Sequence, residues 1–99
     1  MKEIKIKEIN LSNNSPMTII AGLNVLEDEV MALDVAERLK EITIKHNVPF
    51  VFKASFDKAN RSSVNSYRGP GLKGGKKIFE AIKKNIDVPI ITDIHEEGQ

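Results

Sequence analysis

The feature that most constrains the fold is an apolar stretch that begins with Val-Pro and occurs twice. Residues 48–53 read Val-Pro-Phe-Val-Phe-Lys, and residues 88–93 read Val-Pro-Ile-Ile-Thr-Asp. Proline at the start of a strand removes no ladder hydrogen bond, and continuous apolar strands are typical of strands buried on both faces. Residues 17–21 form a similar stretch, while residues 26–46 and 72–86 carry apolar side chains at helical spacing. This alternation predicts an α/β fold, a parallel sheet covered by helices.

A different pattern precedes these units. Residues 3–9 alternate apolar and polar side chains, which predicts a half-buried strand, and the polar residues 10–16 predict a turn. We therefore expect residues 1–16 to form an N-terminal β-hairpin segment, followed by one α/β domain over residues 17–99.

Two architectures use such units, the doubly wound sheet and the (β/α)₈ barrel, and both bind ligands at the carboxyl ends of their strands. A barrel needs about 250 residues. This chain of 99 residues supplies three predicted strands and two helices, so we expect it to be the first part of something longer.

Charge is concentrated in one segment. Residues 53–77 contain seven Lys or Arg and one Asp, whereas the whole chain has a net charge of only +1. Such a cationic segment predicts an anionic ligand. Its only aromatic residues are Phe56 and Tyr67, too few for the stacking surfaces of a single-strand nucleic-acid binder. A phosphorylated small molecule is the better prediction, and we expect no nucleic-acid partner.

Several classes are excluded by composition. The chain has no cysteine, which rules out a disulfide framework, a thiolate nucleophile and Cys-ligated metal within these residues. Its longest apolar stretch is far below the roughly 20 residues of a membrane span. The sequence after Met1 lacks the pattern of a signal peptide. We expect a cytoplasmic protein without a membrane partner.

Candidate site residues follow the predicted strands. Asn24, Lys53 and Asp93 with His95 should lie at one edge of the sheet. The segment 53–63, Lys-Ala-Ser-Phe-Asp-Lys-Ala-Asn-Arg-Ser-Ser, leaves the second of these strands. Arginine binds phosphate oxygens with two parallel hydrogen bonds, lysine acts as a point charge, and hydroxyls add further donors. This composition predicts a phosphate site.

A glycine motif offers an alternative. Residues 69–74 read Gly-Pro-Gly-Leu-Lys-Gly and match G-x-G-x-x-G, with Asp93 about 20 residues further on, as in dinucleotide-binding proteins. However, those glycines must follow a strand directly, and here a predicted loop over residues 55–71 intervenes. We favour a turn at the start of a helix.

The longest motifs resemble those of one family. Residues 53–63, together with 67–72 (Tyr-Arg-Gly-Pro-Gly-Leu), closely resemble 3-deoxy-D-manno-octulosonate 8-phosphate synthases (KDO-8-phosphate synthases), also called 2-dehydro-3-deoxyphosphooctonate aldolases. Residues 21–27 (Ala-Gly-Leu-Asn-Val-Leu-Glu) and 91–96 (Ile-Thr-Asp-Ile-His-Glu) match the same family in the same order. The resemblance covers about residues 17–99.

The resemblance implies a fold and an activity. It implies a TIM (β/α)₈ barrel, of which this chain holds an N-terminal hairpin and about the first two and a half βα units. It implies a synthase that condenses phosphoenolpyruvate with D-arabinose 5-phosphate, releasing phosphate, in lipopolysaccharide biosynthesis. It also implies a homotetramer. The 99-residue chain alone is expected to be inactive, and the alternative is a non-catalytic or truncated barrel fragment that binds phosphorylated ligands weakly.

The resemblance also implies roles for individual residues. Lys53, Ser55 and Lys58 would contact phosphoenolpyruvate, and the two lysines would stabilise charge that develops in the transition state. The sugar phosphate would be held by Asn60, Arg61 and Ser62.

The other implied roles concern residues beside the reacting groups. Asp93 would lie near the reacting carbons and orient water or move a proton, and His95 would lie beside the site. Metal-dependent members of the family carry Cys where this chain has Asn24, and an amide is a poor ligand for such a metal. The resemblance thus points to the metal-independent type, with no metal site and no cofactor.

Overall fold

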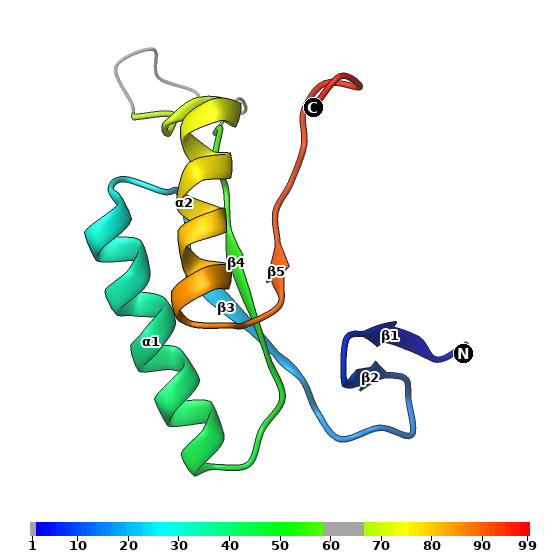
Figure 1. Ribbon diagram of the computed structural model, residues 1–99. Helices are drawn as coiled ribbons and strands as arrows, with labels where there is room; N and C mark the ends of the chain where they lie inside the picture. The colour runs from blue at the N-terminus through cyan, green and yellow to red at the C-terminus, as the bar shows by residue number, and fades with distance from the viewer. Residues whose placement is uncertain (1, 59–66) are drawn as a thin grey trace.

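The computed structural model describes residues 2–58 and 67–99, which form a small hairpin, a parallel sheet and two helices (Figure 1). The hairpin and the sheet are separate, and the sheet has the strand order β3-β4-β5. The elements, in chain order, are β1 (Ile4–Ile6), β2 (Ile9–Leu11), β3 (Ile19–Leu23), α1 (Glu29–Lys45), β4 (Phe50–Ala54), α2 (Gly71–Asn85) and β5 (Ile90–Ile91).

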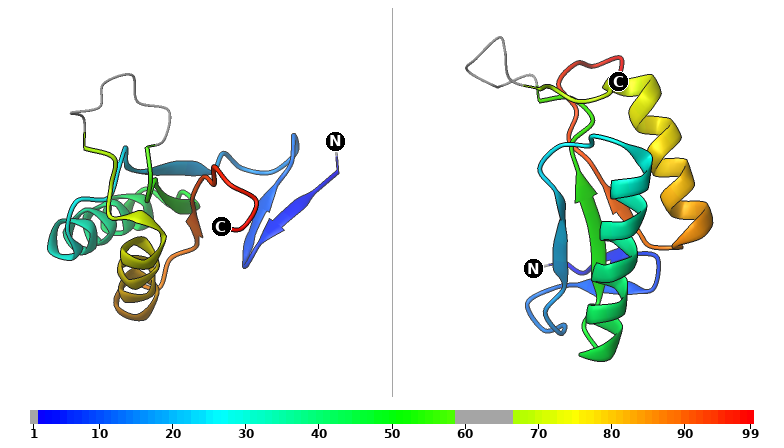
Figure 2. Two further views of the ribbon diagram at one scale, coloured as in Figure 1. Left: turned by 90° about the horizontal axis from the view of Figure 1, so that it is seen from above. Right: turned by 90° about the vertical axis from the view of Figure 1, so that its left-hand side faces the viewer.

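The three sheet strands are parallel, as the alternating pattern predicted. Ile19 lies opposite Phe50 in the β3–β4 pair, and Phe52 lies opposite Ile90 in the β4–β5 pair. Figure 2 shows both helices on one side of this sheet and the β1–β2 hairpin on the other. The α/β class is confirmed, and each parallel connection runs through a helix.

The strand and the turn within the N-terminal hairpin segment differ from the prediction. The single strand expected over residues 3–9 is wrong, because the chain reverses at Lys7, which has φ +52°. Two short antiparallel strands result, with Ile4 opposite Leu11 and Ile6 opposite Ile9. The second strand therefore begins inside the expected strand and extends into the expected turn.

Helix α1 begins later than residue 26, where the apolar spacing placed its start. The Asp28 carboxylate accepts a hydrogen bond from the Met31 N–H at 2.7 Å and caps the helix. Leu26 lies before the cap, buried, and donates its N–H to the Ser55 carbonyl at 2.9 Å. The residues between β3 and α1 are therefore fastened to the end of β4.

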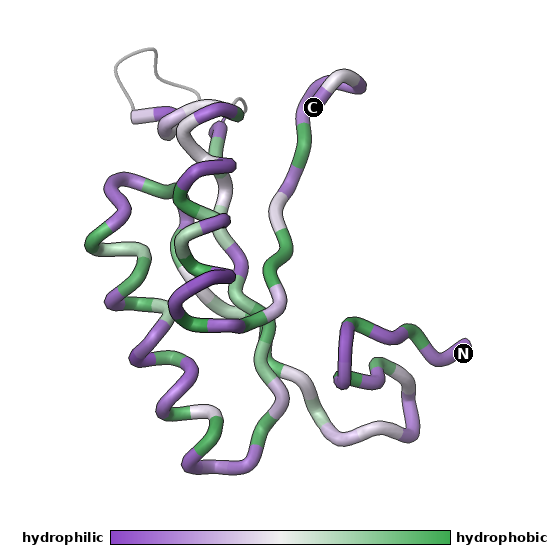
Figure 3. Tube along the Cα trace, in the orientation of Figure 1, coloured by the Kyte–Doolittle hydropathy of each residue, from purple (hydrophilic) through white to green (hydrophobic). Residues whose placement is uncertain are grey.

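Alternation along β4 decides which side chains form the core. Phe50, Phe52 and Ala54 are buried in the cluster that contains Ala36 of α1 and Ile82 of α2. Successive side chains of a strand point to opposite faces, so Val51 and Lys53 belong to the face without helices. Figure 3 shows both helices alternating between hydrophilic and hydrophobic residues, the pattern of helices with one covered face.

Strand β5 is shorter than the predicted stretch of residues 88–93. Only Ile90 and Ile91 pair, and within the described residues they pair with β4 alone. A strand is defined by its hydrogen-bonded neighbour, so an edge strand can end before its apolar pattern does. Among the helices in residues 2–58 and 67–99, none has the length and apolarity needed to cross a membrane.

Candidate active site

The carboxyl ends of β3, β4 and β5 meet at one edge of the sheet, the upper edge in Figure 1. Leu23 lies opposite Ala54, and Lys53 lies opposite Ile91. The residues that follow each strand therefore emerge side by side. These are Asn24 after β3, Ser55 after β4, and Thr92 with Asp93 after β5.

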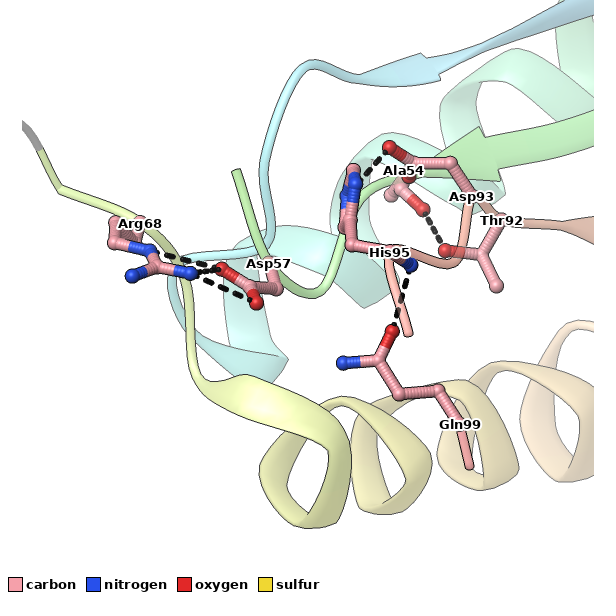
Figure 4. A network of polar contacts seen from close by, with 7 residues as sticks. All are labelled: Ala54, Asp57, Arg68, Thr92, Asp93, His95 and Gln99. Atoms are coloured by element: carbon pink, nitrogen blue, oxygen red, sulfur yellow. Dashed lines mark hydrogen bonds and ion pairs between the residues drawn. The ribbon is translucent and has the colours of Figure 1, made fainter. Parts of the chain in front are cut away.

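Cross-strand hydrogen bonds fix two of these segments to the end of β4. The Thr92 hydroxyl donates to the Ala54 carbonyl at 2.7 Å, as Figure 4 shows. On the other side, the Leu26 N–H reaches the Ser55 carbonyl. Thr92, the residue before Asp93, thus fixes the position of Asp93 relative to β4.

Asp93 and His95 form a polar pair beyond β5. Nε2 of His95 lies 3.0 Å from Oδ2 of Asp93, and the His95 backbone N–H donates to Oε1 of Gln99 at 2.8 Å (Figure 4). The His95 side chain is 22% exposed. A carboxylate that accepts from one imidazole nitrogen orients the ring and determines which nitrogen carries the proton.

The environment of Asp93 keeps its carboxyl group ionised. Burial acts to raise the pKa of Asp93, but hydrogen bonding from the Ser55 hydroxyl and from the Asp93 backbone, with the charges of His95 and Lys53, lowers that pKa below its ordinary value of 3.8.

Two buried oxygens at this edge remain available to a ligand. Ser55 Oγ and Asp93 Oδ1 are both buried and, within the described residues, neither makes a hydrogen bond of good geometry. The hydroxyl is near enough to influence the carboxylate, yet a better-aligned partner would satisfy both atoms. Buried polar atoms of this kind usually have a partner.

Lys53 approaches the site from the sheet face that the helices leave bare. Its backbone lies between Gly22 and Ile91 in the register, and its side chain is half-buried. A side chain at position 22 would collide with the Lys53 carbonyl oxygen. Glycine is therefore required for the close approach of β3 to β4 beside this lysine.

The segment after Ser55 contains an ion pair that charge counting did not reveal. Arg68 Nε donates to Asp57 Oδ1 at 3.0 Å, and Nη2 donates to Oδ2 at 3.1 Å (Figure 4). Arg68 was one of the cations from which the anion site was predicted, but it is bound to a carboxylate. The sum of charges over residues 53–77 hides this contact. A search for an acid and a base at the two ends of the predicted loop could have found it.

The structure brings four predicted site residues together: Lys53, Ser55, Asp93 and His95. Asn24 lies at the same edge and is exposed, and Lys58 is half-buried just beyond it. No side-chain hydrogen bond or ion pair between described residues joins Asn24 or Lys58 to the four. The predicted sugar-phosphate ligands Asn60, Arg61 and Ser62 lie outside the described residues.

The structure contradicts the alternative that residues 69–74 form a dinucleotide-binding turn. Helix α2 begins at Gly71, and residues 55–70 separate it from β4. Gly69 and Gly71 have φ +114° and +79°, so Gly69 lies in a turn before the helix and Gly71 is the first residue of the helix. They do not form the direct strand-to-helix turn that cradles a pyrophosphate.

The comparisons with known proteins all point to one family. The sequence model of the DAHP synthetase I family matches residues 2–99 of this chain. A 2-dehydro-3-deoxyphosphooctonate aldolase of Pseudoalteromonas translucida is 60% identical over 96 residues, covering 97% of this chain and 34% of the relative. Proteins of the same name from Colwellia psychrerythraea and Pseudomonas savastanoi pv. phaseolicola are 56% and 55% identical, over 100% and 99% of this chain and 35% of each relative. The chain thus spans about a third of the length of these curated relatives.

Proposed function

Because the chain belongs to the DAHP synthetase I family, we propose that the whole protein is a KDO-8-phosphate synthase. It condenses phosphoenolpyruvate with D-arabinose 5-phosphate and releases phosphate, as a step in lipopolysaccharide biosynthesis. The observation that carries this proposal is identity of 55–60% across nearly all of this chain to proteins named 2-dehydro-3-deoxyphosphooctonate aldolase. The polar edge formed by Lys53, Ser55 and Asp93 supports it.

A (β/α)₈ barrel is the fold we propose for the whole protein. The parallel sheet, with a helix after β3 and another before β5, has the repeating unit of such a barrel. Its bare face carries Ile20 and Ile91, both partly exposed, as expected of strands whose inner face is completed by further strands. The polar edge lies at the carboxyl ends, where barrel enzymes place their sites.

The proposed chemistry forms two bonds and breaks one. C3 of the enol attacks the aldehyde carbon of the sugar, while water adds its oxygen to C2 of phosphoenolpyruvate. The resulting phosphorylated hemiketal then loses phosphate by cleavage of its C2–O bond. Both substrates are anions that repel each other, so ammonium groups must hold them together.

Each site residue has a role in that scheme. The Lys53 and Lys58 ammonium groups bind phosphoenolpyruvate and stabilise developing negative charge, and the buried Ser55 hydroxyl offers it a hydrogen bond. Asp93 is ionised at neutral pH because its pKa is lowered, which suits it to orient the attacking water or accept its proton. His95, held by Asp93, lies beside it.

Three more residues complete the proposed binding site. By resemblance, Asn60, Arg61 and Ser62 hold the phosphate of the sugar, and part of this contact comes from a neighbouring subunit of a homotetramer. We also propose a cytoplasmic location. Sedimentation of the whole protein tests the assembly, and a monomer with full activity would contradict it.

Lys58→Ala in the whole protein tests the site. It should abolish phosphate release from the two substrates together, because the substituted enzyme lacks one of the two ammonium groups. Lys45→Ala is the matched control, since Lys45 ends α1 and is exposed; it should retain wild-type turnover. Equal turnover by both variants would contradict the placement of the site.

The reaction is proposed to need no metal, because Asn24 stands where metal-dependent relatives carry cysteine. Activity should therefore be unchanged after incubation with a strong chelator. Loss of phosphate release on chelation, restored by Mn²⁺ or Zn²⁺, would contradict this assignment.

The 99-residue chain can also be incubated with both substrates by itself. Weak binding of phosphoenolpyruvate without phosphate release is expected for the chain alone, whereas turnover by it would contradict this expectation.

A further inference from the structure

We propose that Asp57 and Arg68 are positioning residues that fix Lys58 for the condensation; this rests on the proposed function. Their side chains meet through two parallel hydrogen bonds, from Nε to Oδ1 and from Nη2 to Oδ2, with Nη2 also 2.9 Å from Oδ1. This two-pronged arrangement fixes direction as well as distance, which a single charge contact does not.

The pair lies directly at Lys58. Beside the side-chain contact, the Lys58 N–H donates to the Arg68 carbonyl at 2.6 Å. One residue earlier, the Phe56 carbonyl accepts from the Gly71 N–H at 3.0 Å. The stretch leaving β4 and the stretch entering α2 are thus joined by backbone bonds on both sides of Asp57, and Lys58 belongs to that junction.

The surroundings of this pair differ from those of the exposed ion pairs on the two helices. The Asp57 side chain is 20% exposed, and Arg68 is 60% exposed. By contrast, Arg38 and Asp34 on α1 share a single hydrogen bond at 3.2 Å with side chains 73% and 58% exposed. Exposed single-contact pairs hold little in place, whereas the sheltered Asp57 carboxylate keeps the Arg68 guanidinium in one orientation.

Arg68 therefore acts on the reaction through Lys58. The Arg68 guanidinium hydrogen-bonds Asp57, and the Arg68 backbone carbonyl accepts the Lys58 N–H. Loss of the side-chain pair would free that backbone and displace the Lys58 ammonium from the reacting atoms. A displacement of about 1 Å at a reacting group can cost about a hundredfold in rate.

The test measures kcat and KM for both substrates in Asp57→Asn, Arg68→Gln and the double variant of the whole protein. We expect kcat to fall about tenfold to a hundredfold, with a smaller change in KM and an unchanged unfolding midpoint. The double variant should lose no more than either single variant, because the residues act as one unit. Asp34→Asn and Arg38→Gln, the matched controls, should keep wild-type kcat.

A kcat within twofold of wild type in both single variants would overturn the proposal, as would losses that multiply in the double variant. Arg68→Lys carries the same test if a neutral variant does not fold, because it keeps the charge but lacks the second prong; wild-type kcat in it would also count against the proposal.

A second readout separates this proposal from the proposed function. The Lys58 amide should be protected from hydrogen exchange in the wild-type protein and exchange faster in Arg68→Gln. If the wild-type protein releases no phosphate from the two substrates, the proposed function is wrong. If the Lys58 amide exchanges equally fast in the wild type and in Arg68→Gln, the proposed role of the Asp57–Arg68 pair is wrong.

Discussion

Gly69 lies at the end of the loop before α2 in a backbone conformation that favours glycine. It has φ +114°, and an added Cβ would lie 2.5 Å from the Phe56 carbonyl oxygen and 2.9 Å from Val25 Cγ2. Gly71, two residues later, has φ +79° but nothing within 4 Å of such a Cβ. The first position therefore combines backbone strain with a collision, and the second has strain alone.

Gly69→Ala should thus lower the free energy of unfolding by about 3 kcal/mol, and Gly71→Ala by only about 1 kcal/mol. Urea unfolding of the two variants measures the difference. Equal losses would show that the collision is relieved at no cost.

Asp93 gives a pH prediction at the same scale. Its folded pKa lies below the ordinary 3.8, so its charged form stabilises the folded protein above that pH. This contribution is lost as the pH falls from about 3.8 through the lower folded pKa, because the unfolded chain binds the proton first. The stability difference between wild type and Asp93→Asn should be constant from neutral pH down to about 5 and shrink below 4. A difference that grows on acidification would contradict the sign.

At the scale of elements, the start of α1 depends on its cap. Asp28 accepts the Met31 N–H, and removing that acceptor leaves a helix donor without its partner. Asp28→Ala should lower the free energy of unfolding by about 1 kcal/mol, whereas Asp28→Asn, which keeps an oxygen acceptor, should cost far less. Thermal or urea unfolding compares them, with Glu27→Ala as the neighbouring-acid control. Identical stability of Asp28→Ala and wild type would refute the capping role.

The sequence patterns identified the parallel strands and helices better than the turns. The Val-Pro stretches located β4 and β5, although only β4 is buried along most of its length and Ile91 of β5 is 41% exposed. Alternation over residues 3–9 could not reveal the reversal at Lys7, since a tight turn between short strands keeps the same alternation. The Asp57–Arg68 pair was also missed, because the partners are eleven positions apart and meet only through the fold. Asp93 and Lys53 were placed at one edge because parallel strands end together.

At the scale of the whole molecule, no helix in the described part of the chain covers one face of the sheet, although Val51 on that face is buried. Ile20 and Ile91 are 47% and 41% exposed, and within the described residues β3 and β5 each pair only with β4. Open strand edges beside apolar side chains promote association. Sequence patterns alone left the doubly wound sheet and the barrel both open, because closure of a sheet depends on strands beyond these three.

The 99-residue chain on its own should therefore self-associate in sedimentation experiments. Ile20→Lys should weaken this association because it charges the bare face. Val30→Lys is the control: Val30 is 79% exposed but lies on α1, so its substitution should leave association unchanged. A chain that stays monomeric at all concentrations would show that these edges are protected.

The placement of the two histidines gives this chain two built-in spectroscopic probes. His95 lies beside Asp93 at the carboxyl edge, whereas His46 caps the far end of α1. In magnetic resonance spectra of the isotope-labelled chain, the imidazole signal of His95 would report on anything entering the site, and that of His46 would serve as an internal reference. Occupancy could then be followed without dyes, fusions or a coupled assay.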